Sequence, residues 1–316
     1  MYLFWRPPLF AAVSFLCLLP TVLHAELRVG ASAVDITPTA FPVLISGGIL
    51  SRTGEPRDIY ARAIVIGDGQ QRLAMVVTDS CMLPQDLIDQ VKAMVVAQSD
   101  LRADRIMISS THTHTAPAAM GALGTEADAS YLPHLRIKLT EAILNANANL
   151  TPAKVGWGAT DAHQFTALRR WILRPDQMRL DPFGNQNVRA SMHTARDNLE
   201  NVTGESGPED PELSMLVFRT LEDRPLALLA NFSMHYYGGG GAADYFGDYC
   251  QQLEASLSAT GESTPPFVAI MSHGCSGDIW RVDYRDGTNQ TYDGFVDGMV
   301  ERTLQAVDGI EYLADL

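Results

Sequence analysis

The sequence predicts a mixed α/β (or α+β) fold, a layered sandwich in which a mixed sheet is flanked by helices and includes hairpins. Two observations lead to this prediction. Segments with strand patterning alternate with segments of helical periodicity along most of the chain. Two strand pairs, within 62–80 and 213–235, are joined by short turns and so predict antiparallel hairpins. A purely parallel sheet would contain neither hairpin.

The individual elements follow in order along the chain. The first hairpin turns at a Gly-Asp-Gly sequence, and residues 84–98 then begin with Pro84 and carry apolar residues at helical spacing. Residues 161–210 have weak periodicity and many Arg, Asn, Asp, Gly and Pro residues, which predicts a long irregular segment. The other predicted elements are a strand at 105–110, a long amphipathic helix at 127–148, a strand at 153–160, the hairpin at 213–235, a helix at 244–258, a strand at 266–274 and a helix at 291–307.

Composition limits the class of protein and its partners. The 316 residues can bury a large core, in one big domain or two ordinary ones. Hydrophobic residues make up 46% and charged residues 19%, as in a soluble globular protein. The formal net charge of −14 and the lack of any basic run argue against nucleic acid as a partner and against binding to a membrane surface.

The N-terminus predicts export. One arginine precedes an apolar stretch from Leu9 to Leu23, and His24-Ala25 follows, which is typical of a signal peptide over residues 1–25. The alternative is a membrane anchor, but the stretch of about 15 residues is shorter than the ~20 that span a bilayer. We therefore expect a secreted or periplasmic protein with a mature domain at 26–316, and no stable membrane span after removal of the signal.

Three cysteines remain in the mature chain, Cys81, Cys250 and Cys275. Their odd number and wide spacing argue against a disulfide framework, although one pair would be possible in an oxidising compartment. The chain has no Cys-x-x-Cys pair, so a zinc site built from thiolates is not expected.

Three predicted strands end in polar loops that contain histidine. "SSTHTHTAPAAMG" (109–121) holds His112 and His114, "NFSMHYYGGGGAADY" (231–245) holds His235 and Asp244, and "SHGCSGD" (272–278) holds His273 and Ser276. Sites in α/β sheets gather beyond the strand ends, where such loops converge. Neutral imidazole is the commonest metal ligand, so one histidine from each of two loops, with oxygen ligands, would make an open hydrolytic zinc site.

Each of these loops also has a simpler interpretation. His112 and His114 could be surface or capping residues, and in an extended chain their side chains would point to opposite sides, so that only one would bind a metal. The four glycines at 238–241 could form a flexible loop, or allow the backbone to approach a ligand or metal closely. "GCSGD" lacks the final glycine of a Gly-x-Ser-x-Gly nucleophile elbow, and Asp278 could simply cap the next segment.

Taken together, these loops resemble the N-terminal domain of the neutral/alkaline non-lysosomal ceramidases, in their short bacterial form. The family's Gly-Thr-His-Thr-His-Ser/Thr-x-Pro loop resembles "SSTHTHTAP", and its Asn-Phe-x-x-His strand end resembles "NFSMH". Further similar segments, in the family's order, are "TDSCM" (78–82), "LRRWILRPD" (168–176), "GPEDPELSMLVFR" (207–219) and "ADYFG" (243–247). The resemblance extends from about Gly30 to Ala306.

The resemblance implies a zinc-dependent amidase that acts on a small lipid-like or N-acyl substrate such as ceramide. It implies that His112 and His235 hold Zn²⁺ and that His114 faces the scissile group. It further implies that Arg169 or Arg170 contacts the polar end of the substrate, with Arg170 the residue that we assign to the site. Asp79 and Asp244 would support the catalytic groups.

The sequence departs from the family pattern in two ways. The family's catalytic serine lies in a Gly-Asp-x-Ser-Pro-Asn loop, which reads "GDIWRVD" here, so Trp280 stands at the serine position. The family's remaining zinc ligands, a Glu and a Tyr, come from later segments that do not occur before Leu316. The resemblance therefore predicts a domain truncated at its C-terminus.

Three other functions fit the same residues. A non-catalytic secreted binding domain on this fold is favoured by Trp280 and by the missing ligands. A zinc-dependent esterase or deacylase would act on another substrate, and a serine hydrolase would use Ser276 as nucleophile. Zinc content distinguishes the binding domain from the zinc-dependent hydrolase, and loss of activity on chelation would count against the serine hydrolase.

Overall fold

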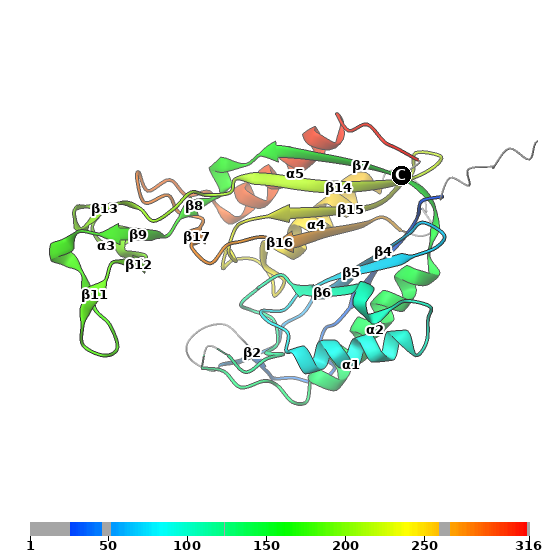
Figure 1. The fold of residues 1–316 in the computed structure, drawn as a ribbon, viewed down its shortest axis with the longest axis horizontal. Coiled ribbons are helices and arrows are strands. Elements are labelled where there is room, and N and C mark those ends of the chain that lie inside the picture. The colour runs from blue at the N-terminus through cyan, green and yellow to red at the C-terminus, as the bar shows by residue number, and fades with distance from the viewer. Residues whose placement is uncertain (1–25, 46–51, 123, 259–265, 315–316) are drawn as a thin grey trace, which may run out of the picture.

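A computed structural model of the chain describes residues 26–45, 52–122, 124–258 and 266–314. The predicted signal peptide, residues 1–25, lies outside the described residues. Eight strands form one mixed sheet in the order β16-β15-β14-β7-β1-β4-β5-β6, with helices on both sides (Figure 1). The predicted mixed α/β class with hairpins is thus confirmed.

The large sheet folds over on itself into two halves of four strands each. The halves are joined where β1 pairs with β7, at Arg28–Pro152 and Val29–Thr151, next to a hydrogen bond of 2.9 Å from the N–H of Ala153 to the carbonyl of Leu27. An apolar cluster with residues from both halves, among them Ile64, Phe218 and Ile270, lies between them. The first half contains β1 (Arg28–Asp35), β4 (Tyr60–Gly67), β5 (Arg72–Thr78) and β6 (Ile106–Ser110), and the second contains β7 (Thr151–Asp161), β14 (Glu212–Thr220), β15 (Pro225–Phe232) and β16 (Val268–His273).

Helices cover the outer face of each half and complete a helix–sheet–sheet–helix sandwich. Helices α1 (Gln85–Val96) and α2 (Leu132–Ala148) pack on the first half, and α4 (Asp244–Leu257) and α5 (Tyr292–Val307) pack on the second (Figure 1). Successive residues of a strand therefore face opposite layers, one toward the other half of the sheet and the next toward the helices. For example, Ile270 lies between the two halves, whereas Met271 packs against α4 and α5. Gly30 lets α2 come close to β1, because a Cβ there would lie 2.1 Å from the carbonyl oxygen of Ala146.

Each half contains one parallel strand pair that is connected through a helix. Strands β5 and β6 are parallel and joined through α1, and β15 and β16 are parallel and joined through α4. The other neighbouring strands of the sheet pair antiparallel, including the predicted hairpins β4–β5 and β14–β15. The carboxyl ends of a parallel pair meet at one edge, so each half presents two loops side by side.

The segment 161–210, predicted to be irregular, is instead a small folded extension. Its strands β12-β9-β13 form a three-stranded sheet, and β8 pairs with the distant β17. Trp171, Ala195 and Tyr284 form its own small core. Its elements are β8 (Ala167–Leu168), β9 (Arg170–Leu173), β10 (Arg179–Leu180), β11 (Gln186–Val188), β12 (Ala190–Met192), α3 (Thr194–Asp197) and β13 (Val202–Glu205), and its partner is β17 (Ile279–Trp280).

Other differences from the expected elements are small. Helix α2 begins at Leu132 and not at 127, because the Asp128 carboxylate accepts hydrogen bonds from the backbone of Ser130 and Tyr131 and holds the chain in a turn. Strands β1, β2 (Val43–Ile45) and β3 (Arg52–Gly54) were not predicted. Single-turn 3₁₀ helices occur at Ala103–Arg105, His163–Phe165, Pro175–Gln177 and Leu199–Asn201. Among the described residues, no helix has both the length and the apolar character needed to cross a bilayer.

Candidate metal centre

Four histidines meet where the loops from the two halves converge. His112 and His114 follow β6 in the first half, whereas His235 follows β15 and His273 ends β16 in the second half. The His112 ring lies in the middle of the cluster, with ring centroids 4.7 Å from His114, 4.9 Å from His235 and 5.5 Å from His273. The structure therefore brings together all three histidines that the sequence analysis placed in the site, and adds His273.

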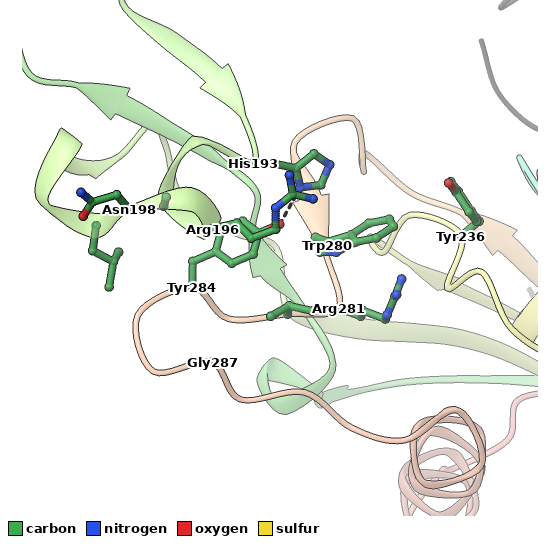
Figure 2. A pocket seen from close by; sticks show the side chains of 11 residues that line it. His193, Arg196, Asn198, Tyr236, Trp280, Arg281, Tyr284 and Gly287 are labelled. Carbon is green, nitrogen blue, oxygen red and sulfur yellow. Dashed lines mark hydrogen bonds between the residues drawn. The ribbon is translucent and has the colours of Figure 1, made fainter. Parts of the chain in front are cut away.

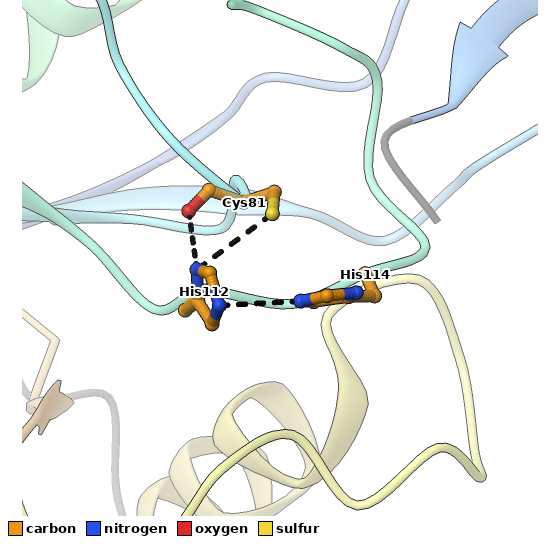
Figure 3. Close-up of side chains that lie close together, drawn as sticks. All are labelled: Cys81, His112 and His114. Carbon is orange, nitrogen blue, oxygen red and sulfur yellow. Dashed lines mark hydrogen bonds between the residues drawn. The ribbon is translucent and has the colours of Figure 1, made fainter. Parts of the chain in front are cut away.

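Backbone contacts fix the ring of His112. Its N–H donates to the carbonyl of Ser80 at 2.9 Å, and its Nδ1 lies 2.9 Å from the carbonyl oxygen of Cys81 (Figure 3). A carbonyl oxygen only accepts hydrogen bonds, so Nδ1 must carry a hydrogen, and in the neutral ring the lone pair is then on Nε2. In metal sites, a histidine ligand commonly donates the N–H of its other ring nitrogen to a carbonyl or carboxylate, which fixes the tautomer and the ring orientation. The bond from His112 to Cys81 is of this kind.

The expectation that His112 and His114 point to opposite sides is wrong. Their Nε2 atoms lie only 3.2 Å apart (Figure 3). The reason is local: His112 has a positive φ of 66°, in the left-handed region, so the chain is not extended at this point and side-chain alternation does not apply. Two metal–nitrogen bonds of about 2 Å at a tetrahedral angle would place their nitrogens roughly 3.3 Å apart, so this spacing suits two ligands of one ion.

His235 and His273 are joined through Ser276. The Ser276 hydroxyl lies 2.5 Å from Nε2 of His273 and 3.3 Å from Nδ1 of His235. Burial, aided by nearby Arg169 and the other histidines, lowers the pKa of His235 to about 3, and burial also lowers that of His273 to about 4. Both rings are therefore neutral at physiological pH, which is the form that binds a metal.

Cys81 also lies next to these rings. Its Sγ is 3.7 Å from Nδ1 of His112, and Cys81, His112 and His114 have ligand atoms that all lie within 4.8 Å of one another. This buried group could hold a metal ion. Burial raises the pKa of the Cys81 thiol to about 12, so the thiol is protonated at neutral pH and the imidazoles are the better donors. Cys81, Cys250 and Cys275 are all free.

Asp79 and Asp244 are buried and position the loops through their hydrogen bonds. Asp79 accepts from the backbone N–H of Tyr60 at 2.8 Å and from Nη1 of Arg62 at 3.1 Å. Asp244 accepts from the backbone N–H groups of Tyr237 and Gly238, both at 2.8 Å, and so shapes the loop directly after His235. In the described contacts neither carboxylate meets a histidine ring: Asp79 connects the end of β5 to β4, and Asp244 holds the backbone that follows His235.

The two neighbouring arginines lie in different places. Arg170, which the sequence analysis assigned to the site, is exposed on β9. Arg169 is 8% exposed, and its Nε and Nη2 donate to the carbonyl of Gly277 at 3.2 and 2.8 Å. The guanidinium carbon of Arg169 lies 5.5 Å from the centre of the Trp280 ring. Arg169 is therefore the one that lies at the site, since successive residues of an extended chain face opposite ways.

Two aromatic residues that sequence reasoning left without a role line the histidine cluster. The Tyr236 ring stacks on His114, with centroids 4.0 Å apart and planes 15° apart. Trp280 lies 6.3 Å from His235 and 5.7 Å from Tyr236, between ring centroids. Tyr236 directly follows a predicted ligand, and Trp280 stands where the sequence resemblance places a serine. These two positions were the signal available in the sequence.

The four-glycine loop is packed against an aromatic ring. A Cβ at Gly239 would lie 2.7 Å from the Tyr292 ring, and one at Gly240 would lie 2.1 Å from the Tyr292 hydroxyl. Across the loop, the hydroxyl of Thr113 donates to the carbonyl of Ala242 at 2.7 Å and so connects the two histidine loops. The close approach that the glycines permit is thus to Tyr292.

The Gly240→Ala variant should be destabilised by roughly 1–3 kcal/mol, because its φ of 68° disfavours a Cβ and Tyr292 would have to move. Urea denaturation measures this loss as the difference in the free energy of unfolding between the variant and the wild type. Gly184→Ala is the matched control: its φ of 87° carries the same backbone cost, but no atom lies within 4 Å of the new Cβ. Equal losses in both variants would show that Tyr292 adds nothing and that the backbone angle alone requires glycine.

Comparison with known proteins places the fold. No protein-family profile matches the chain, and no curated sequence matches it. The solved structure of neutral ceramidase from Pseudomonas aeruginosa is similar, with a TM-score of 0.65 and 18% identity over 90% of this chain and 45% of that one. A ceramidase complexed with C2 is similar with a TM-score of 0.64 and 18% identity, over 90% of this chain and 44% of that one. This chain thus spans less than half the length of either structure, and it has the fold of the part that it covers.

Proposed function

We propose that the chain is an exported zinc-dependent hydrolase of an amide bond in a small lipid-like, ceramide-like N-acyl substrate. The observation that carries this proposal is the convergence of four imidazoles from both halves of the sandwich around the His112 ring, whose centroid lies 4.9 Å from that of His235 and 5.5 Å from that of His273. The fold shared with neutral ceramidase supports the choice of substrate class.

The donor set fits zinc. His112 and His235 are the proposed primary ligands, the first held through Cys81 and the second through Ser276. When bound, zinc would supply a water of lowered pKa and polarise the scissile carbonyl.

The other residues have separate proposed tasks. His114, with its ring against Tyr236, would face the scissile group and transfer a proton or hold the developing oxyanion. Asp79 and Asp244 would hold the loops, and Arg169 would contact the polar end of the substrate. Arg170 faces solvent on β9, and we assign it no role in the reaction.

Chelation tests the proposal on the purified full chain. Bound zinc is measured by mass spectrometry and hydrolysis by release of fatty acid from an N-acylsphingosine. Treatment with 1,10-phenanthroline should remove the zinc and reduce hydrolysis to background, and added Zn²⁺ should restore both. Hydrolysis that survives complete zinc removal would contradict the proposal, and substrate binding with zinc but no turnover would favour the non-catalytic binding domain.

A serine hydrolase is the second candidate, because Ser276 lies within hydrogen-bond distance of the neutral His273. In that mechanism His273 would take the hydroxyl proton as Ser276 attacks the carbonyl and would give it to the amine as the C–N bond breaks, and water would then hydrolyse the acyl-serine ester. Ser276→Ala should then abolish hydrolysis while the zinc content stays constant. In the metal-dependent mechanism the same variant would only loosen His235 and should keep measurable turnover.

Residues 1–25 are proposed to be a signal peptide, which would direct the protein to be exported. Expression of the full chain in a bacterial host, followed by N-terminal sequencing of the exported protein, should give Glu26 as the first residue. Retention of the full chain in the membrane fraction would favour the anchor instead.

A further inference from the structure

A pocket of about 670 Å³ lies beside the histidine cluster, between the small extension and the loop after β17 (Figure 2). Its wall includes His193, Arg196, Tyr236, Trp280, Arg281 and Tyr284. The pocket is connected to the metal centre through two of these side chains: Tyr236 stacks on His114, and Trp280 lies near His235. A ligand in the pocket would therefore contact the same aromatic rings that border the candidate reaction centre.

The pocket is positively charged in a strongly acidic protein. Of the described residues that line it, none is Asp or Glu, although the chain as a whole has a net charge of −14. Arg196 and Arg281 line the pocket, and the buried Arg169 lies on Trp280 behind it. Arg196 is exposed and forms an ion pair with Asp197, with Nη2 and Oδ1 3.2 Å apart. Its charge is therefore partly neutralised, and it contributes less to the positive charge of the pocket than an unpaired guanidinium would.

Arg281 is the cation best placed to bind a ligand. Its Nη1 donates to the carbonyl of Tyr237, and its guanidinium carbon lies 4.5 Å from the centre of the Trp280 ring and 4.7 Å from that of Tyr237. These contacts fix the guanidinium plane yet neutralise none of its charge, and neither Arg281 nor Arg169 forms an ion pair with a described carboxylate. A fixed guanidinium without a carboxylate partner suits a carboxylate or a phosphate, because each can present two oxygens to the guanidinium N–H groups.

The histidine in the pocket does not add charge. Burial, together with Arg169 and Arg196, lowers the pKa of His193, and its Nδ1 lies 2.5 Å from the Tyr284 hydroxyl. The positive charge of the pocket therefore comes from arginines, which stay charged at all physiological pH values.

We propose that this pocket binds a carboxylate or phosphate group at the end of the substrate, so that the preferred substrate is an anionic N-acyl compound and not a neutral one. This inference rests on the proposed function, because it takes the histidine cluster as the place where the amide is cleaved. The anion would lie against Arg281, with the aromatic rings of Trp280 and Tyr236 between it and the amide.

Three probes that share one acyl amide test the proposal by calorimetric binding to the full chain. N-decanoylethanolamine is neutral, N-decanoylglycine carries a carboxylate, and N-decanoylphosphoethanolamine carries a phosphate. At least one anion should bind roughly 10-fold or more tightly than the neutral probe, since a charge-assisted hydrogen bond contributes that much, and the preference should fall with added salt. The relative affinity of the two anions identifies the group that the pocket prefers.

Variants of Arg281 test whether the preference for an anionic probe arises in this pocket. Arg281→Gln should bind all three probes about equally, and Arg281→Lys should keep part of the preference, because charge remains without the planar fork. Arg102→Gln is the control, since Arg102 is exposed and pairs with Asp104 far from the pocket, and it should bind like the wild type. Thermal unfolding of each variant shows whether the fold is kept.

The outcomes separate this inference from the proposed function. Preferential binding of an anion without hydrolysis of any probe or of N-acylsphingosine would keep the pocket and refute the hydrolase. Hydrolysis with equal binding of all three probes would keep the hydrolase and refute the anion pocket. A preference that persists in folded Arg281→Gln would also refute it.

Discussion

The His112→Ala variant is expected to lose bound zinc and to lower amide hydrolysis by roughly 10³-fold or more, because zinc supplies several kcal/mol of transition-state stabilisation. His112 is the central ring of the cluster, and Cys81 holds it in the tautomer that presents Nε2. The rings of His114, His235 and His273 all lie around it, so its loss would remove the donor that the whole cluster shares.

The His114→Ala variant provides the comparison. The proposal gives His114 the chemical step, so this variant should keep its zinc and lose turnover by about 10²–10⁴-fold, as for a general acid or base. The measurements are zinc per chain and the rate of fatty acid release. The 3.2 Å between the two Nε2 atoms makes the opposite result informative: equal zinc loss in both variants would show that His114 is a ligand as well. Zinc retention in both would remove this loop from the metal site.

The thiol can be tested in the same series. Cys81→Ser removes the sulfur but leaves the carbonyl that holds His112. Because Sγ of Cys81 lies beside Nδ1 of His112 and not beside the Nε2 that would hold the ion, the zinc content should be close to that of the wild type. A loss comparable to that of His112→Ala would make Cys81 a ligand.

The largest effect on folding is expected from Asp79→Ala, which should lower the free energy of unfolding by about 3–5 kcal/mol, as for a broken buried ion pair. The side chains of Asp79 and Arg62 are 3% and 4% exposed, and the variant would leave the Arg62 charge buried without its closest partner. A carboxylate oxygen of Glu254 lies 3.9 Å from Nε of Arg62, which is too far for a hydrogen bond, and Nε has no other acceptor among the described residues. Glu254 would therefore compensate for only part of the interaction that Arg62 loses with Asp79.

Urea denaturation without metal measures this loss. The double variant Arg62→Met/Asp79→Ala removes both charges and should regain much of the stability. Asp104→Ala removes a carboxylate that is paired with Arg102 on the surface, and it should change stability little. If Asp79→Ala were as stable as Asp104→Ala, the buried pair would not be what holds this loop in place.

Much of the fold could be predicted from the sequence, because the information is local. The hairpins and the helices α1, α4 and α5 follow from apolar periodicity and turn residues over short windows. The extension at 161–210 could not be predicted, because its strands are two to four residues long and β8 pairs with Ile279 and Trp280, more than a hundred residues later. Such pairing leaves no periodic signal.

The site was predictable in its residue types but not in its geometry. The histidine-rich strand ends indicated which loops meet. The left-handed backbone at His112 was not predictable, because it depends on hydrogen bonds to Ser80 and Cys81, which lie about 30 residues earlier in the chain. The assignment of Arg170 to the site, in place of Arg169, has the same cause. Which of the two adjacent arginines turns inward is decided by the carbonyl of Gly277, which lies in a loop more than a hundred residues later.

The two halves of the sandwich each bring two of the four histidines, and so neither half alone has the full donor set. His112 and His235 are about 120 residues apart in sequence, so an ion held by both would close a long loop and remove much chain entropy from the unfolded state. The ion would then act as a cross-link between half-sheets that share a short strand pairing and the apolar cluster between them. In a medium poor in zinc, that cluster and the hydrogen bond from Thr113 to Ala242 would be what keeps the two pairs of histidines facing each other.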